Sequence, residues 1–547
     1  MAVPLSPETR AAALAALPAA DLDLLVVGGG ITGAGVARDA ALRGLRTALL
    51  ERVDFAAGTS SRSSKLIHGG VRYLEQGDVA LVREAAAERQ VLRRIAPHLA
   101  EPRLMVLPTY RRATHAKLGI GLWTFEKIAT VAPDERHRMW DRAATLREEP
   151  LLAPAGLHGA AAFVEYLTDD ARLVLATVRA AHEAGALVAN YAEVVAIEAG
   201  RPSAVTARDA LSGATLRARA RAVVNAAGPW VDTVRGLAGA GGGRRLRLTK
   251  GIHVVVSHAR LPIRHVVVMQ ARDRRSVFAV PRDGVTYLGT TDTDYGAPTL
   301  YPAVTADDAD YLLEAANRTF SGPPLGRADV LGAWAGLRPL LHEEGKRPSE
   351  ISRKDEIMVD AASGLVSIAG GKLTTYRTMA ERVVDLVCRR LGASGKPGRT
   401  AALPLPGGER APGELPALVR RVAEALPRLG PGAAERLVRL HGTGAEAICA
   451  RAAADRDAGA PLPGLPDVPR AEVEHVLETE MALTLTDVLE RRTRALLFAP
   501  GQGLEAAETV AALMARRLGW DAARAAAEVD RYRRLATSLR SFPRSET

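Results

Sequence analysis

Cysteine is scarce in this chain: only Cys388 and Cys449 occur among its 547 residues. The two lie far apart and outside any spacing that holds a metal ion. The sequence therefore predicts no disulfide framework and no metal site. So few cysteines are typical of proteins in a reducing compartment, and we expect a cytoplasmic location.

Long apolar runs are missing as well. No uncharged apolar segment reaches the roughly 18 residues that a membrane-spanning helix needs. The alanine-rich residues 11–20 only faintly resemble an export signal, whereas Ser6-Pro7-Glu8 is typical of a helix start with Ser6 as the N-cap. We therefore expect no transmembrane helix and interpret residues 1–20 as an N-terminal helical extension.

Aromatic residues make up only 4% of the chain, and no basic stripe is interleaved with them. This pattern argues against nucleic acid as a partner. The formal net charge is nevertheless +11, with an isoelectric point near 9.9, and a basic balance favours anionic partners. A phosphorylated substrate fits this charge, and so does an anionic membrane surface, because attraction to lipid needs no motif.

The chain is too long for one hydrophobic core, so two or more domains are expected. Its hydrophobic fraction of 47% and mean hydropathy of −0.01 are ordinary for globular proteins. Glycine, serine and proline gather around residues 393–416, which predicts a linker at residues 396–414. Beyond it, residues 415–547 carry apolar residues at helical spacing without a catalytic motif, and this predicts an all-helical C-terminal domain.

Helical spacing in that domain is clearest over residues 415–426, 473–494 and 504–539. His475 and Glu478 lie close together on the second of these helices and could hint at a metal site. We favour a surface helix here.

The most informative pattern begins at residue 24. A short apolar strand at residues 24–27 runs into Gly-Gly-Gly-Ile-Thr-Gly at residues 28–33, and an alanine-rich helical stretch follows. A second apolar run at residues 47–50 ends on Glu51. Strand, glycine turn, helix, strand and acid in this order form the dinucleotide-binding fingerprint, whereas a glycine turn alone often binds nothing.

Each part of the fingerprint has a physical task. Gly28 permits the tight turn, Gly30 lets the backbone approach a pyrophosphate, and Gly33 lets the helix pack close to the strand. The helix N-terminus offers N–H groups and a partial positive charge to the phosphates. Glu51 lies 51 − 33 = 18 residues after the last glycine, where it can accept ribose hydroxyls.

A serine-rich stretch, GTSSRSSKLIHGGVRYLE at residues 58–75, follows the fingerprint. Such composition is usually a solvated loop, but the second half interleaves apolar residues with histidine, arginine and tyrosine. This stretch resembles the FAD-dependent glycerol-3-phosphate dehydrogenases. Four further segments resemble that family in the same order: KGIH at 250–253, GAWAGLRPL at 332–340, ISR at 351–353 and GGKLTTYR at 370–377.

The resemblance extends from about residue 21 to the last helices. It implies an α/β and α+β fold in which a Rossmann-type FAD-binding domain is interleaved with a β-rich substrate domain, plus the helical C-terminal domain. The FAD-dependent oxidoreductase region would span residues 21–395. Its FAD-binding parts are expected at about 21–75, 160–245 and 330–395, and its substrate parts at about 76–159 and 246–329.

The resemblance also implies an activity: FAD-dependent oxidation of sn-glycerol 3-phosphate at C2 to dihydroxyacetone phosphate. Relatives divide between membrane-associated dehydrogenases that reduce a quinone and oxidases that use oxygen. The oxidases usually carry a longer internal insertion, and none is evident here, so we favour a quinone. We then expect the protein at the inner face of the cytoplasmic membrane. A homodimer is a candidate assembly, although the sequence does not fix the oligomeric state.

The residues assigned to FAD lie in the glycine turn, the serine-rich stretch, a small-residue turn after a strand, and the last motif. They are Gly28, Gly30, Ile31, Thr32, Gly33, Glu51, Arg52, Thr59, Ser60, Ser63, Ser64, Lys65, His68, Gly69, Gly70, Val194, Ala226, Ala227, Gly228, Gly336, Gly371, Lys372, Leu373 and Thr374. The substrate-binding candidates are Arg72, Tyr73, His253, Arg338, Arg353, Lys372 and Thr375, and the catalytic candidates are His253, Arg338 and Lys372.

His253 is the leading base candidate because imidazole can take a proton near neutral pH. It could instead be a structural histidine in a strand, and His68 is expected to contact the cofactor. The planar fork of arginine suits a phosphate, although a single arginine is more often a surface charge. Two pairs of acids offer a similar choice. Asp169 with Asp170 predicts a helix cap. Asp292 with Asp294 predicts a turn, because further ligands for a cation are missing.

Three other functions stay open. One is a glycerol-3-phosphate oxidase that makes peroxide. Another is an FAD-dependent amino-acid or amine oxidoreductase, which would need to recognise a carboxylate. The third is a non-catalytic flavoprotein sensor, which the intact cofactor and pocket motifs argue against. Anaerobic bleaching of the flavin by glycerol 3-phosphate, by an amino acid or by neither would separate the dehydrogenase from the last two.

Overall fold

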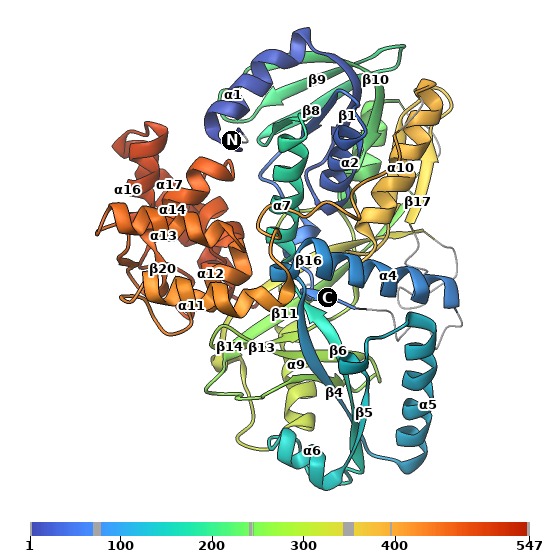
Figure 1. Ribbon diagram of the computed structural model, residues 1–547, viewed down its shortest axis with the longest axis vertical. Coiled ribbons are helices and arrows are strands. Elements are labelled where there is room, and N and C mark those ends of the chain that lie inside the picture. The colour runs from blue at the N-terminus through green and yellow to red at the C-terminus, as the bar shows by residue number, and fades with distance from the viewer. Residues whose placement is uncertain are drawn as a thin grey trace.

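The computed structural model describes residues 3–68, 78–239, 243, 245–342, 355–393 and 396–543. Two lobes lie one above the other along the long axis, and the C-terminal helices pack against one side of the molecule (Figure 1). The first helix, α1 (Pro7–Ala16), starts as predicted: the Ser6 hydroxyl accepts from the backbone N–H of Thr9, and the Thr9 hydroxyl accepts from that of Ser6.

The upper lobe contains the sheet that includes the two strands of the dinucleotide-binding fingerprint. Its strands run in the order β17-β18-β10-β1-β2-β7, and the pairs from β18 to β7 are parallel. These strands are β1 (Asp21–Val27), β2 (Thr47–Leu50), β7 (Leu187–Ala189), β10 (Thr215–Asn225), β17 (Asp355–Val359) and β18 (Val366–Gly370), with β8 (Ala192–Glu198) and β9 (Ser203–Asp209) extending from β10.

The strands of this sheet are buried on both faces because helices cover it. The covering helices are α2 (Ile31–Leu42), α7 (Asp170–Glu183), α8 (Val231–Leu237) and α10 (Tyr376–Leu391). Helix α2 packs between α7 and α10, and its small residues let those helices approach closely: a Cβ on Gly35 would lie 3.1 Å from Ala380 Cβ. Buried side chains of the strands form one core with α2, α7 and α10, and the alternate strand residues form a second core to which α8 contributes.

The lower lobe contains the second, largely antiparallel sheet, in the order β15-β11-β14-β13-β12-β4-β6-β3. Its strands are β3 (Leu66–Ile67), β4 (Glu101–Thr109), β5 (Arg138–Asp141), β6 (Gly159–Leu167), β11 (Leu246–Ser257), β12 (Val266–Gln270), β13 (Ser276–Arg282), β14 (Val285–Gly289), β15 (Thr293–Tyr295) and β16 (Val330–Leu341). Around it lie α4 (Val79–Ile95), α5 (Arg112–Ala129), α6 (Arg142–Glu148) and α9 (Ala306–Thr319).

Two of these strands belong to a different part of the fold from the one that the sequence predicts. Strand β16 pairs with β11 along most of its length, and β6 pairs with β4. Residues 330–341 and 160–167, expected in the FAD-binding parts, therefore belong to the sheet of the lower lobe. Local patterning could not reveal this, because the pairing partners lie far away in the sequence.

The C-terminal part is helical, as predicted, with one small hairpin formed by β19 (Pro461–Leu462) and β20 (Leu465–Pro469). Its helices are α11 (Leu415–Ala425), α12 (Ala433–His441), α13 (Gly444–Ala454), α14 (Arg470–Thr479), a π-helical turn (Asp487–Arg492), α15 (Ala495–Phe498), α16 (Ala507–Leu518) and α17 (Ala522–Ser538). The expected continuous helices at 473–494 and 504–539 are each interrupted, the latter at Gly519, whose φ of +70° ends α16.

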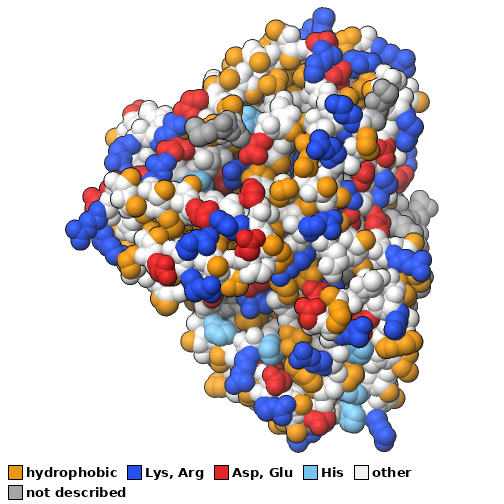
Figure 2. Space-filling view, in the orientation of Figure 1, with side chains coloured by type: hydrophobic (Ala, Val, Ile, Leu, Met, Phe, Trp, Pro, Cys, Tyr) orange, Lys and Arg blue, Asp and Glu red, His pale blue; other side chains and the backbone are white. Residues whose placement is uncertain are grey.

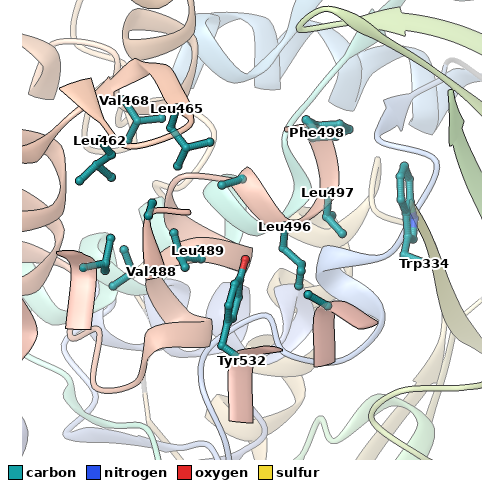
Figure 3. Packing of buried hydrophobic residues seen from close by; sticks show 14 of the residues in the cluster. Trp334, Leu462, Leu465, Val468, Val488, Leu489, Leu496, Leu497, Phe498 and Tyr532 are labelled. Atoms are coloured by element: carbon teal, nitrogen blue, oxygen red, sulfur yellow. The ribbon is translucent and has the colours of Figure 1, made fainter. Parts of the chain in front are cut away.

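The C-terminal helices share a core with the lower lobe. Trp334 of β16 lies beside Leu496, Leu497 and Phe498 of α15 (Figure 3). Farther from the sheet, Tyr532 of α17 donates its hydroxyl to the backbone oxygen of Gln502 at 2.5 Å. The C-terminal helices are therefore packed against the sheet and do not form a separate lobe.

The predicted linker at residues 396–414 is not an extended tether. Arg38 of α2 donates from Nη2 to the backbone oxygen of Leu403 at 2.7 Å, and Leu405 donates its N–H to that of Ile95 at 2.8 Å. The Leu405 side chain is fully buried. These residues lie against α2 and α4 and close the bottom of the upper lobe.

Candidate active site

A cavity of about 750 Å³ is lined by residues of both lobes. Most of the sequence-predicted site residues that the structure describes line it. These are Gly28, Gly30, Ile31, Thr32, Glu51, Arg52, Thr59, Ser60, Ser63, Ser64, His68, Val194, Ala226, Ala227, Gly228, His253, Gly336, Arg338, Gly371, Lys372 and Leu373.

The glycine turn shapes one end of this cavity. Gly28 has a φ of +110°, and a Cβ on it would lie 2.7 Å from the backbone oxygen of Ala226. A Cβ on Gly33 would lie only 1.8 Å from the backbone oxygen of Gly28, so the start of α2 can approach β1 only with glycine there. A Cβ on Gly30 would lie 3.2 Å from Ser60 Oγ, so a side chain there would crowd the serine that faces the turn. The turn therefore offers a bare backbone surface of the kind that a pyrophosphate needs.

Glu51 stands at the end of β2, on the same side of the cavity. Its carboxylate accepts hydrogen bonds from the backbone N–H groups of Gly29 at 2.6 Å and Val53 at 2.9 Å. Burial raises the pKa of this carboxyl above its ordinary value, although both hydrogen bonds oppose the rise. The carboxylate is fixed in one orientation beside the glycine turn, where it can accept a ribose hydroxyl.

Arg338 of β16 also lines the cavity. Its Nη1 donates to Asp292 Oδ1 at 3.0 Å and to the backbone oxygen of Thr291 at 3.1 Å, and Nη2 donates to Thr290 Oγ1 at 3.0 Å. Gly251 of β11 leaves room for the guanidinium, because a Cβ there would lie 2.4 Å from Nη2. The cation is thereby held over β11 and remains partly exposed to the cavity.

The turn predicted at Asp292 and Asp294 was wrong, because residues 293–295 form the short strand β15, which pairs with β11. Asp292 pairs with Arg338, and Asp294 in the short strand β15 pairs with Arg247 at 2.6 Å. Each carboxylate is thus engaged with an arginine of the neighbouring strands. The cation-loop alternative has no support from this geometry.

His253 lies on β11 two residues after Gly251, so both face the same side of the strand. Its Nε2 is 2.9 Å from Ser64 Oγ, and its ring stacks on Trp334 with the centroids 4.8 Å apart. Burial, together with the charges of Lys65 and Arg338, lowers the pKa of His253 well below its usual 6.5. The imidazole is therefore neutral near pH 7, and its burial opposes protonation.

Lys372 also borders the cavity, immediately after Gly371. Gly371 has a φ of +85°, and a Cβ there would overlap the Met379 side chain at 2.2 Å. The charge of Lys372 contributes to lowering the pKa of Glu84 on α4. Lys372 and Arg338 thus bring cations to the cavity wall from segments far apart in the sequence, in addition to Arg52, Arg62 and Arg208.

Four of the predicted residues do not line the cavity. Gly33 and Thr375 belong to the packing of α2 and the start of α10, and Thr374 donates its hydroxyl to the backbone oxygen of His68 at 3.4 Å. Lys65 is fully buried, with Nζ 2.8 Å from Asp170 Oδ1. A second group, Gly69, Gly70, Arg72, Tyr73 and Arg353, lies outside the described residues.

Comparison with known proteins agrees with this geometry. Residues 23–377 match the FAD dependent oxidoreductase family, and residues 398–525 match the C-terminal domain of alpha-glycerophosphate oxidase. The aerobic glycerol-3-phosphate dehydrogenase of Bacillus subtilis is 41% identical over 91% of this chain and 92% of its own length. The chain belongs to this family of FAD-dependent dehydrogenases.

Further relatives support the assignment. The enzyme of the same name from Staphylococcus haemolyticus is 40% identical over 87% of both chains. Among solved structures, the glycerol-3-phosphate dehydrogenase of Bacillus halodurans complexed with FAD is 36% identical, covers 98% of both chains and superposes with a TM-score of 0.82. The L-alpha-glycerophosphate oxidase of Mycoplasma pneumoniae, at 19% identity and a TM-score of 0.56, shares the fold. The predicted family, fold class and cofactor are confirmed.

The C-terminal part contributes charged residues that the sequence did not predict for the site. We call Glu490, Arg491, Arg492 and Arg494 the C-terminal brace. Glu490 pairs with Arg62 at 2.7 Å, Arg491 pairs with Asp54 at 2.6 Å, and Arg492 also pairs with Asp54. All of these side chains are buried. The brace thus fixes both ends of a segment, residues 54–62, that lines the cavity.

Arg494 reaches the same segment through two carboxylates of α7. Its Nε lies 2.9 Å from Asp169 Oδ2, and its Nη2 donates to Asp170 Oδ1 at 3.2 Å. Asp170 in turn accepts from the backbone N–H and the hydroxyl of Ser63, at 3.0 and 2.7 Å. The predicted cap is confirmed for Asp169, which accepts from the N–H of Arg172. The paired acids therefore serve both the helix and the cavity wall.

The surface-helix interpretation of His475 was wrong. His475, His441 and Glu480 are buried and could place one ligand atom each within 4.8 Å of one another. However, Arg172 already donates to Glu480 Oε1 at 2.6 Å and lies 3.1 Å from His441 Nδ1. A guanidinium in this position competes with a metal ion for the same lone pairs, so the cluster is best described as an ionic contact between α7 and the C-terminal helices.

Proposed function

We propose that this protein oxidises sn-glycerol 3-phosphate at C2 to dihydroxyacetone phosphate and passes the electrons to a quinone. One observation carries the proposal. A neutral, buried imidazole (His253) and a partly exposed guanidinium (Arg338) lie on neighbouring strands and line the same cavity as the glycine turn. Oxidation of a secondary alcohol that carries a phosphate needs a proton acceptor and a phosphate-binding cation side by side.

Arg338 is the proposed phosphate ligand. Its Nη1 is fixed by Asp292 and its Nη2 by Thr290, so the planar fork is oriented before a ligand arrives. Pre-orientation lowers the entropy cost of binding an anion in a bidentate manner. Lys372 would add a second positive charge. Arg72, Tyr73 and Arg353 remain predicted substrate ligands, and Thr375 would act indirectly through the start of α10.

His253 is the proposed acceptor of the C2 hydroxyl proton. Its neutral imidazole is available at pH 7, and Ser64 Oγ at 2.9 Å fixes the direction of Nε2. Removal of this proton leaves the C2–H pair to depart as hydride while the C2–O double bond forms. When bound in the cavity, FAD supplies the acceptor for that hydride.

The apolar residues of the cavity wall support a quinone as the electron acceptor. Met105, Leu107 and Phe163 of β4 and β6 contribute apolar side chains to the lining of the cavity. A quinone with an apolar tail fits such a wall better than a charged acceptor does. No helix in the described part of the chain is long and apolar enough to cross a bilayer. We therefore propose peripheral contact with an anionic membrane, while the homodimer stays a prediction.

Oxygen is the second candidate acceptor, because residues 398–525 match a domain named after alpha-glycerophosphate oxidase. Purified FAD-loaded protein should be supplied with sn-glycerol 3-phosphate and either a quinone analogue or dissolved oxygen. We expect dihydroxyacetone phosphate as product, rapid turnover with the quinone and little peroxide. Peroxide formed at the rate of product formation would identify an oxidase instead.

A further inference from the structure

Helix α5 carries an unusual outer face. Seven large hydrophobic side chains are exposed among the described residues, and three of them, Tyr110, Ile120 and Trp123, lie on α5 or just before it. Ile120 is 69% exposed and Trp123 is 57% exposed. The helix stands at the outer edge of the lower lobe, on the side away from the C-terminal helices (Figure 1).

The exposed residues form a stripe along the helix. Ala116, Ile120, Trp123 and Lys127 are separated by three or four residues, which places them on one face. The opposite face is anchored in the protein, because Leu122 and Phe125 are buried. The helix is therefore fixed in place with this stripe turned outward.

Basic residues flank the stripe. Residues 111–125 include Arg111, Arg112 and Lys117 but no acid. The single acid of the helix, Glu126, is engaged with His137, whose Nδ1 lies 2.7 Å away. Lys127 extends over the Trp123 ring, 5.7 Å from its centroid. Over the face shown in Figure 2 as a whole, basic and acidic side chains are interspersed.

The same helix borders the cavity. Leu118 lines it together with Leu107, the last apolar residue of β4 before α5. A surface held against α5 would therefore lie beside the apolar wall of the active site. This position suits the delivery of a molecule dissolved in lipid.

We propose that α5 is a docking face for an anionic lipid surface, with Ile120 and Trp123 inserted among the headgroups and the cations paired with their phosphates. The combination of basic residues with an exposed tryptophan and isoleucine is that of interfacial helices. A second copy of this chain is a poorer occupant, because a symmetric contact would bring the same cations together. Lipid docking deepens the proposed function, since it explains how a quinone would reach the cavity.

The test uses the FAD-loaded full chain and vesicles of phosphatidylcholine with or without phosphatidylglycerol. Two double variants remove the two features separately: Ile120→Ser with Trp123→Ser, and Lys117→Ala with Lys127→Ala. Leu211→Ser and Arg219→Glu are matched controls, because both residues are exposed on the other lobe. Co-sedimentation at low and high salt gives the affinity without any substrate.

The wild type and both controls should bind the phosphatidylglycerol vesicles at low salt and be released at high salt. Loss of two cations should weaken binding about 30-fold, at roughly fivefold for each, and the apolar double variant should also bind more weakly. Turnover of glycerol 3-phosphate with a water-soluble dye should stay at the wild-type rate, and turnover with a quinone in the vesicles should fall.

Unchanged vesicle affinity in both double variants would overturn the proposal. So would a change in solution mass of the variants without a change in vesicle affinity, because α5 would then be a subunit contact. Co-sedimentation measures vesicle binding alone, so its result does not depend on whether the protein oxidises glycerol 3-phosphate. A wild type that binds vesicles through α5 yet turns over no glycerol 3-phosphate would contradict only the proposed function.

Discussion

Gly289 and His253 are direct cross-strand partners on β14 and β11. A Cβ on Gly289 would lie 1.9 Å from His253 Cδ2, so the absence of a side chain at residue 289 is what leaves space for the imidazole. Trp334 closes the other side of the ring. The position of the proposed base therefore depends on a glycine that itself has no chemical role.

Gly289→Ala should displace the imidazole and slow flavin reduction by glycerol 3-phosphate. Loss of a general base costs on the order of 10²- to 10⁴-fold in rate, so His253→Asn sets the expected upper limit. Stopped-flow measurement of flavin reduction gives the rate, and the FAD content should stay normal. Gly236→Ala is the control, because nothing lies within 4 Å of a Cβ there. A wild-type rate in Gly289→Ala would argue that the ring position does not matter.

Arg338→Ala should weaken the use of glycerol 3-phosphate while FAD stays bound. A charge-assisted hydrogen bond to phosphate is worth roughly 1.5–3 kcal/mol, or about 10- to 150-fold in kcat/KM. Steady-state kinetics checks this. Arg247→Ala on the neighbouring strand is a matched control, since Arg247 also pairs with an aspartate but is absent from the cavity lining. Equal losses in the two variants would show a structural effect only.

Arg494→Met tests whether the C-terminal brace supports the cavity. The change leaves Asp169 and Asp170 buried with fewer partners, and breaking a buried ion pair costs about 3 kcal/mol or more. We expect a lower melting temperature together with weaker FAD binding, because Asp170 holds Ser63. Arg533→Ala, in an exposed pair with Glu508 in the same part of the chain, should change neither. A variant that melts earlier but binds FAD normally would confine the brace to stability.

Stability should fall on acidification because of two buried histidines. Burial lowers the pKa of His98 and of His475 to about 3, from an ordinary value of 6.5. Below pH 6.5 the unfolded chain takes up protons that the folded chain excludes, so unfolding becomes easier as the pH falls toward 3. Each histidine contributes about 1.4 kcal/mol per pH unit in this range.

Urea unfolding of the holoenzyme at pH 7, 6 and 5 measures this slope. His475→Gln should lower the slope by about 1.4 kcal/mol per pH unit, whereas His158→Gln, at an exposed position, should leave the slope unchanged. A slope that is the same in both variants would mean that His475 is not excluded from protonation in the folded state.

The sequence predicts the dinucleotide-binding half of the site well, because the glycine turn, α2 and Glu51 lie within one short segment. The turn needs glycine for local reasons, namely the φ of Gly28 and the contact between Gly33 and Gly28. Residue types at fixed spacing carry that information. The family motifs extend it to His253, Arg338 and Lys372, which the structure brings to one cavity.

Long-range pairing could not be predicted. Lys65 was expected at the cofactor, yet it is buried against Asp170, and its pKa falls to about 8 through burial and the charge of Arg494. Trp334, which stacks on His253, and Arg494 gave no local signal, because their partners lie 81 and more than 300 residues away. The dense charges near residue 490 were a clue: so many of them next to apolar residues fit buried ion pairs better than a surface helix.

The most direct test of the central claim is anaerobic mixing of the FAD-loaded protein with sn-glycerol 3-phosphate. We predict loss of the visible flavin absorbance and one dihydroxyacetone phosphate per flavin reduced, with His253→Asn slower and Arg338→Ala requiring far more substrate. Flavin that stays oxidised with glycerol 3-phosphate but is reduced by an amino acid such as glycine would contradict it.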